Sequence, residues 1–290
     1  MMYCVVLCLS ACLQLLAAIW GFGETSHEFE IDWRTGAATV RVSTDLSTEQ
    51  HPLPKAKQIA DREVEQLIAG LFMESLTQVY VDSYHNLAEV VAADLDTFGR
   101  INVVAQQGRK ELSYLSLDLR NLNLKYSFPL FGTDGIVAAL ITHSEPYPIQ
   151  QRLGYVSSRA FSGLIIYAKG TYQAIGKDQQ ESIRPALFPR IFDEEMDLVV
   201  DKNRCYPHSL QEWGMVIYTD STDEQAHLDR IGFWPLRTMA RGVFGKNATD
   251  IVISVEAARK LLYRGDNLEL LREGRIMVIL GSTAPSSATE

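Results

Sequence analysis

Cysteine is almost absent from this chain once its opening segment is set aside. Four cysteines occur in 290 residues, and Cys4, Cys8 and Cys12 all lie in the first apolar run, which leaves Cys205 as the only one in the remainder. A lone cysteine cannot form an internal disulfide, so the remainder is expected to be stable through its hydrophobic core. The sequence therefore excludes a small scaffold held together by disulfides.

Positive charge is also in short supply. There are 27 Lys and Arg against 36 Asp and Glu, which gives a formal net charge of −9. Nucleic-acid binding depends on a basic face, and anionic lipid attracts basic segments. The composition therefore predicts no nucleic-acid partner, and membrane contact only through the N-terminal segment if that segment is retained or lipidated.

Several common catalytic motifs are missing. The chain has no Gly-x-Ser-x-Gly elbow, no His-Glu-x-x-His, no Cys-x-x-Cys and no dinucleotide-binding glycine loop. No cofactor and no catalytic residue are predicted, and a non-enzymatic protein is favoured. A hydrolase with a site assembled from distant residues stays open, with Cys205/His208 or Asp82/His85 as candidates.

The segment VVLCLSACLQLLAAIWGFG, residues 5–23, carries no side-chain charge. It ends in Gly21-Phe22-Gly23, a small-x-small pattern typical of signal-peptidase cleavage, and the polar ETSHEFE follows directly. A secretory signal cleaved after Gly23 is therefore favoured. Lipidation of Cys12, in the lipobox-like LSAC, and an uncleaved anchor of about 20 residues stay open. The expected location is periplasmic or extracytoplasmic, and outer-membrane-associated if Cys12 is lipidated.

The hydropathy patterns predict a chain that mixes strands and helices. Residues 27–44 read as two short strands around an Arg-Thr-Gly turn, and residues 55–78 repeat apolar positions at helical spacing. Asn86 and Glu89 form a candidate capping box for a second helix. The leucines of LSYLSLDLRNLNLKYSFPLFG change parity, which predicts a tight turn or bulge near Arg120-Asn121.

Beyond Gly135 the chain consists of short apolar runs separated by turns. FSGLIIYAKG, PALFPRIF, WGMVIYT, DIVIS and RIMVILG are predicted strands, several of them buried on both faces, and STDEQAHLDRIG and SVEAARKLLYRG are predicted helices. The expected fold class is α/β (α+β): a mixed, largely antiparallel sheet with a few packing helices, after an N-terminal hairpin and a long amphipathic helix.

Four regions are expected along the chain. Residues 1–23 form the signal peptide or anchor, and residues 24–145 form the N-terminal hairpin plus a helical region with strands. Residues 146–282 form an α/β C-terminal region, and 283–290 form a polar tail that is expected to be disordered. The proline-containing SEPYPIQQ at 144–151 is the expected seam.

The stretch DEEMDLVVD, residues 193–201, gathers five carboxylates. Calcium loops alternate carboxylates around a turn glycine, and this stretch has no glycine. A hairpin tip is therefore favoured here. A cation site is the alternative, with candidate ligands Asp193, Glu194, Glu195 and Asp197.

Three quoted motifs carry a resemblance. FSGLIIYAKG, RPALFPRIFDEE and RGVFGKNATDIVISVEAARKLL, followed by REGRIMVIL, resemble the C-terminal half of a family of exported bacterial envelope proteins. That family is allied to FlgT-type flagellar ring proteins and to small outer-membrane lipoproteins. Two departures are the longer TYQAIGKDQQESIR and MDLVV in place of a tyrosine-glycine.

The resemblance implies an extracytoplasmic, non-catalytic protein with partners in the envelope or the flagellar apparatus, a homo-oligomer being a further option. We therefore expect an exported structural or interaction protein of the bacterial cell envelope, with flagellar association as one form of this role. Strand edges and the apolar segments YSFPLFG and IGFWPL are the expected contact surfaces. A periplasmic small-ligand or cation-binding module is the alternative.

The intact mass of the native protein purified from cells distinguishes the three N-terminal hypotheses. We expect a chain that starts at Glu24, because the apolar run ends in a cleavage pattern. A mass that corresponds to a lipidated Cys12, or to the uncleaved chain, would overturn this expectation.

Overall fold

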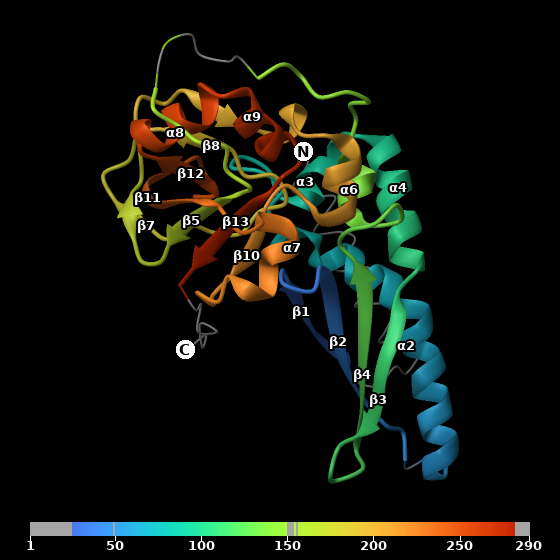
Figure 1. Ribbon diagram of the computed structural model, residues 1–290. Helices are drawn as coiled ribbons and strands as arrows, with labels where there is room; N and C mark the ends of the chain where they lie inside the picture. The colour runs from blue at the N-terminus through green and yellow to red at the C-terminus, as the bar shows by residue number, and fades with distance from the viewer. Residues whose placement is uncertain (1–24, 49, 150–153, 155, 282–290) are drawn as a thin grey trace. The chain divides into compact units, whose positions relative to one another are not determined.

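The computed structural model describes residues 25–281, apart from 49, 150–153 and 155. Gly23 and Cys12, on which the cleavage and lipidation hypotheses depend, lie outside the described residues. Within that range the structure confirms the expected α/β fold class, because helices and a mixed sheet occur together (Figure 1). The expected sheet was largely antiparallel, whereas four of the six strand pairs in the larger sheet are parallel. None of the described helices combines the length and the apolar character needed to span a bilayer.

The described chain forms two compact units that exchange segments. One unit contains the described residues up to Glu30, Thr39–Phe72 and Gly108–Ser127, and the other contains Ile31–Ala38, Met73–Gln107 and the chain from Phe128 onward. The boundary near residues 145–146 stays a prediction of the sequence. The two units are described separately below.

The first unit contains a four-stranded sheet with the order β1-β2-β4-β3. The strands are β1 Thr25–Asp32, β2 Ala37–Asp45, β3 Arg109–Leu115 and β4 Asn121–Pro129. Along β4 half-buried and buried residues alternate, as a sheet with one covered face requires. The predicted long helix is α2, Leu53–Ser75, which buries Ala60, Val64 and Ile68. Lys110 of β3 forms ion pairs with Asp61 and Glu65 of α2, at 2.9 and 2.7 Å.

The parity change in the leucine-rich segment is explained by the β3–β4 hairpin. The chain reverses at residues 116–120, where the Ser116 amide donates to the Asn121 carbonyl at 2.9 Å and Leu119 has a φ of 59°. The predicted turn near Arg120-Asn121 is thus confirmed. The segment YSFPLFG was expected to be an apolar surface, and this prediction was wrong: Tyr126, Phe128 and Leu130 are buried, because they occupy the inward positions of β4 and its continuation.

The second unit is built on a seven-stranded mixed sheet with the order β10-β13-β5-β11-β12-β8-β9. Its strands are β5 Leu164–Ala168, β8 Ile191–Asp193, β9 Leu198–Val200, β10 Ile217–Thr219, β11 Leu236–Phe244, β12 Asp250–Ile253 and β13 Ile276–Leu280. The pairs β10–β13, β13–β5, β5–β11 and β12–β8 are parallel, and β11–β12 and β8–β9 are antiparallel. Every residue of β12 and β13 is buried, which confirms strands covered on both faces.

Helices surround this sheet. They are α3 Leu87–Ala93, α4 Leu95–Gln106, α5 Ile136–Leu140, α6 Pro207–Trp213, α7 Leu228–Ile231, α8 Val255–Leu262 and α9 Gly265–Arg272. Short 3-10 turns occur at Leu76–Gln78, Lys202–Arg204 and Gln225–His227, and a small hairpin pairs β6 Tyr172–Gln173 with β7 Gln180–Glu181. The capping box of Asn86 and Glu89 is confirmed at the start of α3. In Figure 1, α8 and α9 lie toward the top of the sheet and α7 toward the bottom.

Two predicted elements are shorter than expected. PALFPRIF contributes only its last two residues, Ile191 and Phe192, to a strand (β8), because the two prolines lack the amide that a ladder needs. STDEQAHLDRIG forms a 3-10 turn and the single-turn α7, which ends at Gly232 with a φ of 65°.

One buried cation connects three segments of the second unit. Arg230 of α7 is 4% exposed and donates to the carbonyl oxygens of Trp213, Gly214 and Gly274, at distances of 2.6 to 2.9 Å. These carbonyls end α6 and precede β13, and Arg230 also stacks on the Trp213 ring at 5.5 Å. Such carbonyls are costly to bury without a donor.

Replacing Arg230 by alanine is expected to destabilise the protein by roughly 3 kcal/mol, because three buried carbonyls lose a charged donor. Chemical denaturation measures this change. The exposed Arg241, on β11, provides the matched control, and R241A is expected to change stability by less than about 0.5 kcal/mol. Equal stability of R230A and R241A would contradict the role of Arg230.

Candidate functional site

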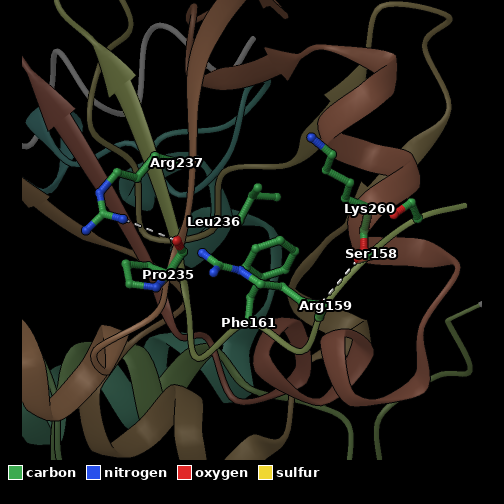
Figure 2. Close-up of a pocket in the computed structure, with 8 residues that line it drawn as sticks. Ser158, Arg159, Phe161, Pro235, Leu236, Arg237 and Lys260 are labelled. Atoms are coloured by element: carbon green, nitrogen blue, oxygen red, sulfur yellow. Dashed lines mark hydrogen bonds between the residues drawn. The ribbon is translucent and has the colours of Figure 1, made fainter.

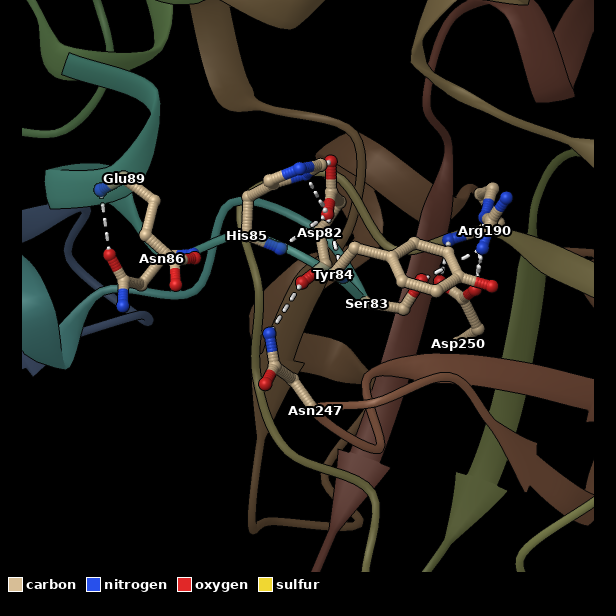
Figure 3. Close-up of polar contacts among 9 residues, drawn as sticks. All are labelled: Asp82, Ser83, Tyr84, His85, Asn86, Glu89, Arg190, Asn247 and Asp250. Atoms are coloured by element: carbon tan, nitrogen blue, oxygen red, sulfur yellow. Dashed lines mark hydrogen bonds and ion pairs between the residues drawn. The ribbon is translucent and has the colours of Figure 1, made fainter. Parts of the chain in front are cut away.

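The polar loop VDSYHN, residues 81–86, contains the first pair of candidate catalytic residues, Asp82 and His85 (Figure 3). The structure brings them together: Asp82 Oδ1 lies 3.1 Å from His85 Nδ1. The same oxygen accepts hydrogen bonds from the backbone amides of Tyr84, at 2.7 Å, and His85, at 2.9 Å. Asp82 therefore stabilises the turn in which both residues lie.

A hydrolase dyad also needs a nucleophile beside the histidine. Among the described residues, no hydroxyl or thiol is hydrogen-bonded to His85. The nearest hydroxyl in sequence, Ser83, is fully buried, and its Oγ accepts a hydrogen bond from Arg190 Nη2 at 2.8 Å. The contact between Asp82 and His85 therefore stabilises the loop, and no nucleophile among the described residues lies in hydrogen-bond contact with it.

An ion pair that the sequence did not predict fixes this loop. Arg190 donates to Asp250 Oδ2 from Nε at 2.9 Å and from Nη2 at 2.7 Å, and its backbone amide donates to Oδ1 at 3.0 Å. The Asp250 side chain is completely buried, and the guanidinium lies against the rings of Tyr84 and Phe192. The only sequence signal is that Arg190 and Asp250 belong to two of the quoted motifs.

Gly245, in the third quoted motif, allows the chain to pack closely against Ser83 of the loop. Gly245 has a φ of 95°, and a Cβ on it would lie 2.2 Å from the Ser83 Cβ. Two residues later the Asn247 amide donates to the Ser83 carbonyl at 2.9 Å. A side chain at position 245 would therefore displace the loop.

Beside this loop lies a small cavity of about 150 Å³, whose lining includes Asp82, Tyr84, Phe188, Arg190 and Lys202. The Lys202 ammonium lies 5.0 Å from the centre of the Phe188 ring and 3.5 Å from the Leu140 carbonyl oxygen. It forms no ion pair with the described residues. Burial lowers the pKa of Lys202, although the charges of Asp82 and Asp201 act in the opposite direction.

The second catalytic candidate, Cys205 with His208, is not assembled. Cys205 is fully buried and its Sγ donates to the carbonyls of Asp201 and Leu271, whereas His208 is exposed and stacks on Tyr206. Burial raises the pKa of the Cys205 thiol, which opposes formation of a thiolate. Pro207 starts α6 between the two residues, and one side chain is buried while the other is exposed, so the structure does not bring this candidate pair together.

The acidic stretch forms the predicted hairpin tip between β8 and β9. The buried Asp193 accepts hydrogen bonds through Oδ1 from the amides of Glu195, at 3.0 Å, and Asp197, at 2.9 Å. Carboxylate oxygens of these three residues lie within 4.8 Å of one another. Glu194 instead accepts from the Val255 amide at the start of α8, at 3.2 Å. These hydrogen bonds explain the positions of Asp193 and Glu194 through the fold, and the cation site stays a prediction.

Among the aromatic side chains of the described residues, the two most exposed belong to the segment IGFWPL. Phe233 is 74% exposed and Trp234 is 67% exposed, on the turn between α7 and β11. Ser162 holds this turn: its Oγ donates to the Ile231 carbonyl at 2.7 Å and accepts from the Trp234 amide at 2.9 Å. The predicted apolar surface at IGFWPL thus consists of Phe233 and Trp234 on a hydrogen-bonded turn, whereas the apolar residues on either side of them are buried.

These features define a class: an α/β protein of two units with an exposed aromatic turn. Comparison with known families gives two matches along the chain. Residues 24–134 match the family model described as Treponema pallidum Tp0624, N-terminal domain, and residues 163–282 match the model described as Treponema pallidum Tp0624, second domain. The expected seam at 144–151 lies between the two matched ranges. None of the curated proteins matches the chain.

The lowered pKa of Lys202 gives a pH-dependent prediction. Because the pKa is lower in the folded state, the charged amine destabilises the fold at neutral pH, and the penalty disappears as pH rises through the unfolded value of about 10.4. K202M is therefore expected to be more stable than the wild type at pH 7, and the difference should shrink toward pH 10.

Chemical denaturation of both proteins across this pH range checks the expectation, with K246M as the control because Lys246 is exposed. A K202M protein that is less stable than the wild type at every pH would show that the amine stabilises the fold.

Proposed function

We propose that this chain is an exported structural or interaction protein of a bacterial cell envelope. The single observation that carries an interaction role is the pair of exposed aromatic side chains, Phe233 and Trp234, on a hydrogen-bonded turn. A soluble surface rarely presents two adjacent large aromatic side chains, and tryptophan is enriched among the residues that dominate protein interfaces. Covering such a side chain contributes about 1.5–3 kcal/mol.

The conformation of the turn supports the same role. In addition to the contacts of its side chain, the Ser162 backbone amide donates a hydrogen bond to the Trp234 carbonyl at 3.1 Å. Since the backbone at Trp234 is already fixed, this turn loses little conformational entropy when a partner covers the side chain.

Export and the bacterial source rest on the sequence. The uncharged run at residues 5–23 and the resemblance to FlgT-type flagellar ring proteins and outer-membrane lipoproteins support an envelope location. Both family models are named for a protein of the bacterium Treponema pallidum, which agrees with a bacterial source. Association with the flagellum is a narrower form of the same proposal.

Crosslinking in intact cells, followed by purification of a tagged chain, tests the proposal. We expect a crosslinked partner, and we expect its recovery to fall at least fivefold in the double variant F233A/W234A, because the apolar contact area is lost. The melting temperature should stay close to that of the wild type, since the two side chains are exposed.

L95A is the matched control, because Leu95 of α4 is 86% exposed and lies outside the turn. Its crosslinks should match those of the wild type. A monodisperse monomer with no crosslinked partner in any cell fraction would contradict the proposal.

A further inference from the structure

A groove of about 560 Å³ is formed by residues from three segments of the second unit (Figure 2). Its cations are Arg159 in the segment before β5, Arg237 at the start of β11 and Lys260 on α8. Phe161 lies in the groove as an apolar surface and Ser157 supplies a hydroxyl group, whereas the Ser158 hydroxyl already donates to the Lys260 carbonyl at 2.8 Å. The chain as a whole carries a net charge of −9, whereas none of the residues that line this groove is acidic.

Two of these cations already have a carboxylate partner. Arg237 forms a bidentate ion pair with Glu224, and Lys260 forms an ion pair with Glu256 at 2.6 Å. Both pairs use glutamates that do not line the groove. The contacts show that each of these side chains binds carboxylates, although their charge is partly neutralised.

Arg159 differs from both. Within the part of the chain that the structure describes, its side chain forms no ion pair and no hydrogen bond. The guanidinium lies 5.3 Å from the centre of the Phe161 ring and 5.9 Å from that of Trp234. In Figure 2 it extends across Phe161, with Arg237 and Lys260 on either side.

Stacking on an aromatic ring fixes the plane of a guanidinium and leaves its N–H edge free. This edge matches the two oxygens of a carboxylate or phosphate in a bidentate contact. Arg159 therefore presents its N–H edge to solvent beside Trp234 of the exposed aromatic turn.

We propose that this groove binds an acidic peptide segment of a protein partner, with a carboxylate on Arg159. The groove has the volume of a ligand site, which is larger than one carboxylate needs, and its cations come from three segments. A peptide with several carboxylates uses such a distribution, while its apolar side chains contact Phe161 and the aromatic turn. This inference rests on the proposed function, since it specifies the partner's chemistry.

A fluorescein-labelled hexaglutamate peptide tests the inference by anisotropy at low salt with the purified protein. We expect saturable binding that weakens as salt is added, and no binding of hexaglutamine. R159Q should weaken binding about tenfold or more, since the bidentate charge-assisted contact with the carboxylate is lost. R159K should give an intermediate affinity, because lysine keeps the charge and loses the planar fork.

R62Q is the matched control, because Arg62 is an exposed arginine of α2, and its affinity should equal that of the wild type. Inorganic phosphate and anionic phosphatidylglycerol vesicles are the competing probes. Equal binding by R159Q and the wild type, equal binding of hexaglutamine, or tighter binding to phosphate or vesicles than to hexaglutamate would each overturn the inference.

The failure of this inference differs from the failure of the proposed function. If hexaglutamate does not bind but cellular crosslinks still depend on Phe233 and Trp234, the acidic-peptide inference is wrong and the interaction role stands. If no crosslinked partner is found, the interaction role itself is wrong.

Discussion

The second unit depends on the close approach of two backbone segments, Phe161–Gly163 and Ile231–Trp234. A Cβ on Gly163 would lie 2.5 Å from the Ile231 carbonyl oxygen, and a Cβ on Gly232 would lie 2.5 Å from the Ser162 side chain. Glycine is therefore required at both positions. Ser162 joins the segments by hydrogen bonds, and the Leu236 amide then donates to the Gly163 carbonyl at 2.8 Å. The parallel pairing of β5 with β11 starts from this contact.

The same contact exposes the aromatic turn and brings Arg159 to Trp234. Because β11 begins immediately after the turn, Pro235 and Leu236 are buried while Phe233 and Trp234 project into solvent. The proposed interface and the proposed carboxylate contact of Arg159 thus result from one local constraint. Their proximity lets a single partner use apolar and charged contacts together, which combines affinity with orientation.

The loop at residues 81–86 shows how polar side chains can resemble a catalytic site while they serve the fold. Asp82 accepts hydrogen bonds from backbone amides of its own turn, and the Ser83 hydroxyl accepts a hydrogen bond from Arg190. Arg190 in turn neutralises the buried Asp250. A buried carboxylate is strongly unfavourable without such a partner. Each of these groups is used in a hydrogen bond of the loop, so the chemistry that the sequence suggested at Asp82 and His85 has a sufficient structural explanation.

Local patterns alone determined the long helix α2, the capping box at Asn86, the turn after Leu115 and the buried strands β12 and β13, because each depends on neighbours a few residues apart. They also identified IGFWPL as an apolar segment. Only the tertiary structure decided that Phe233 and Trp234 of IGFWPL are exposed while the large apolar side chains of YSFPLFG are mostly buried, since a strand position inside a sheet cannot be read from composition. It also decided the pairing of Arg190 with Asp250 and the stacking of Arg159 on Phe161 and Trp234. These contacts join residues that lie far apart in the sequence, and Arg159 and Trp234 are 75 positions apart. Only the folded chain brings such residues together.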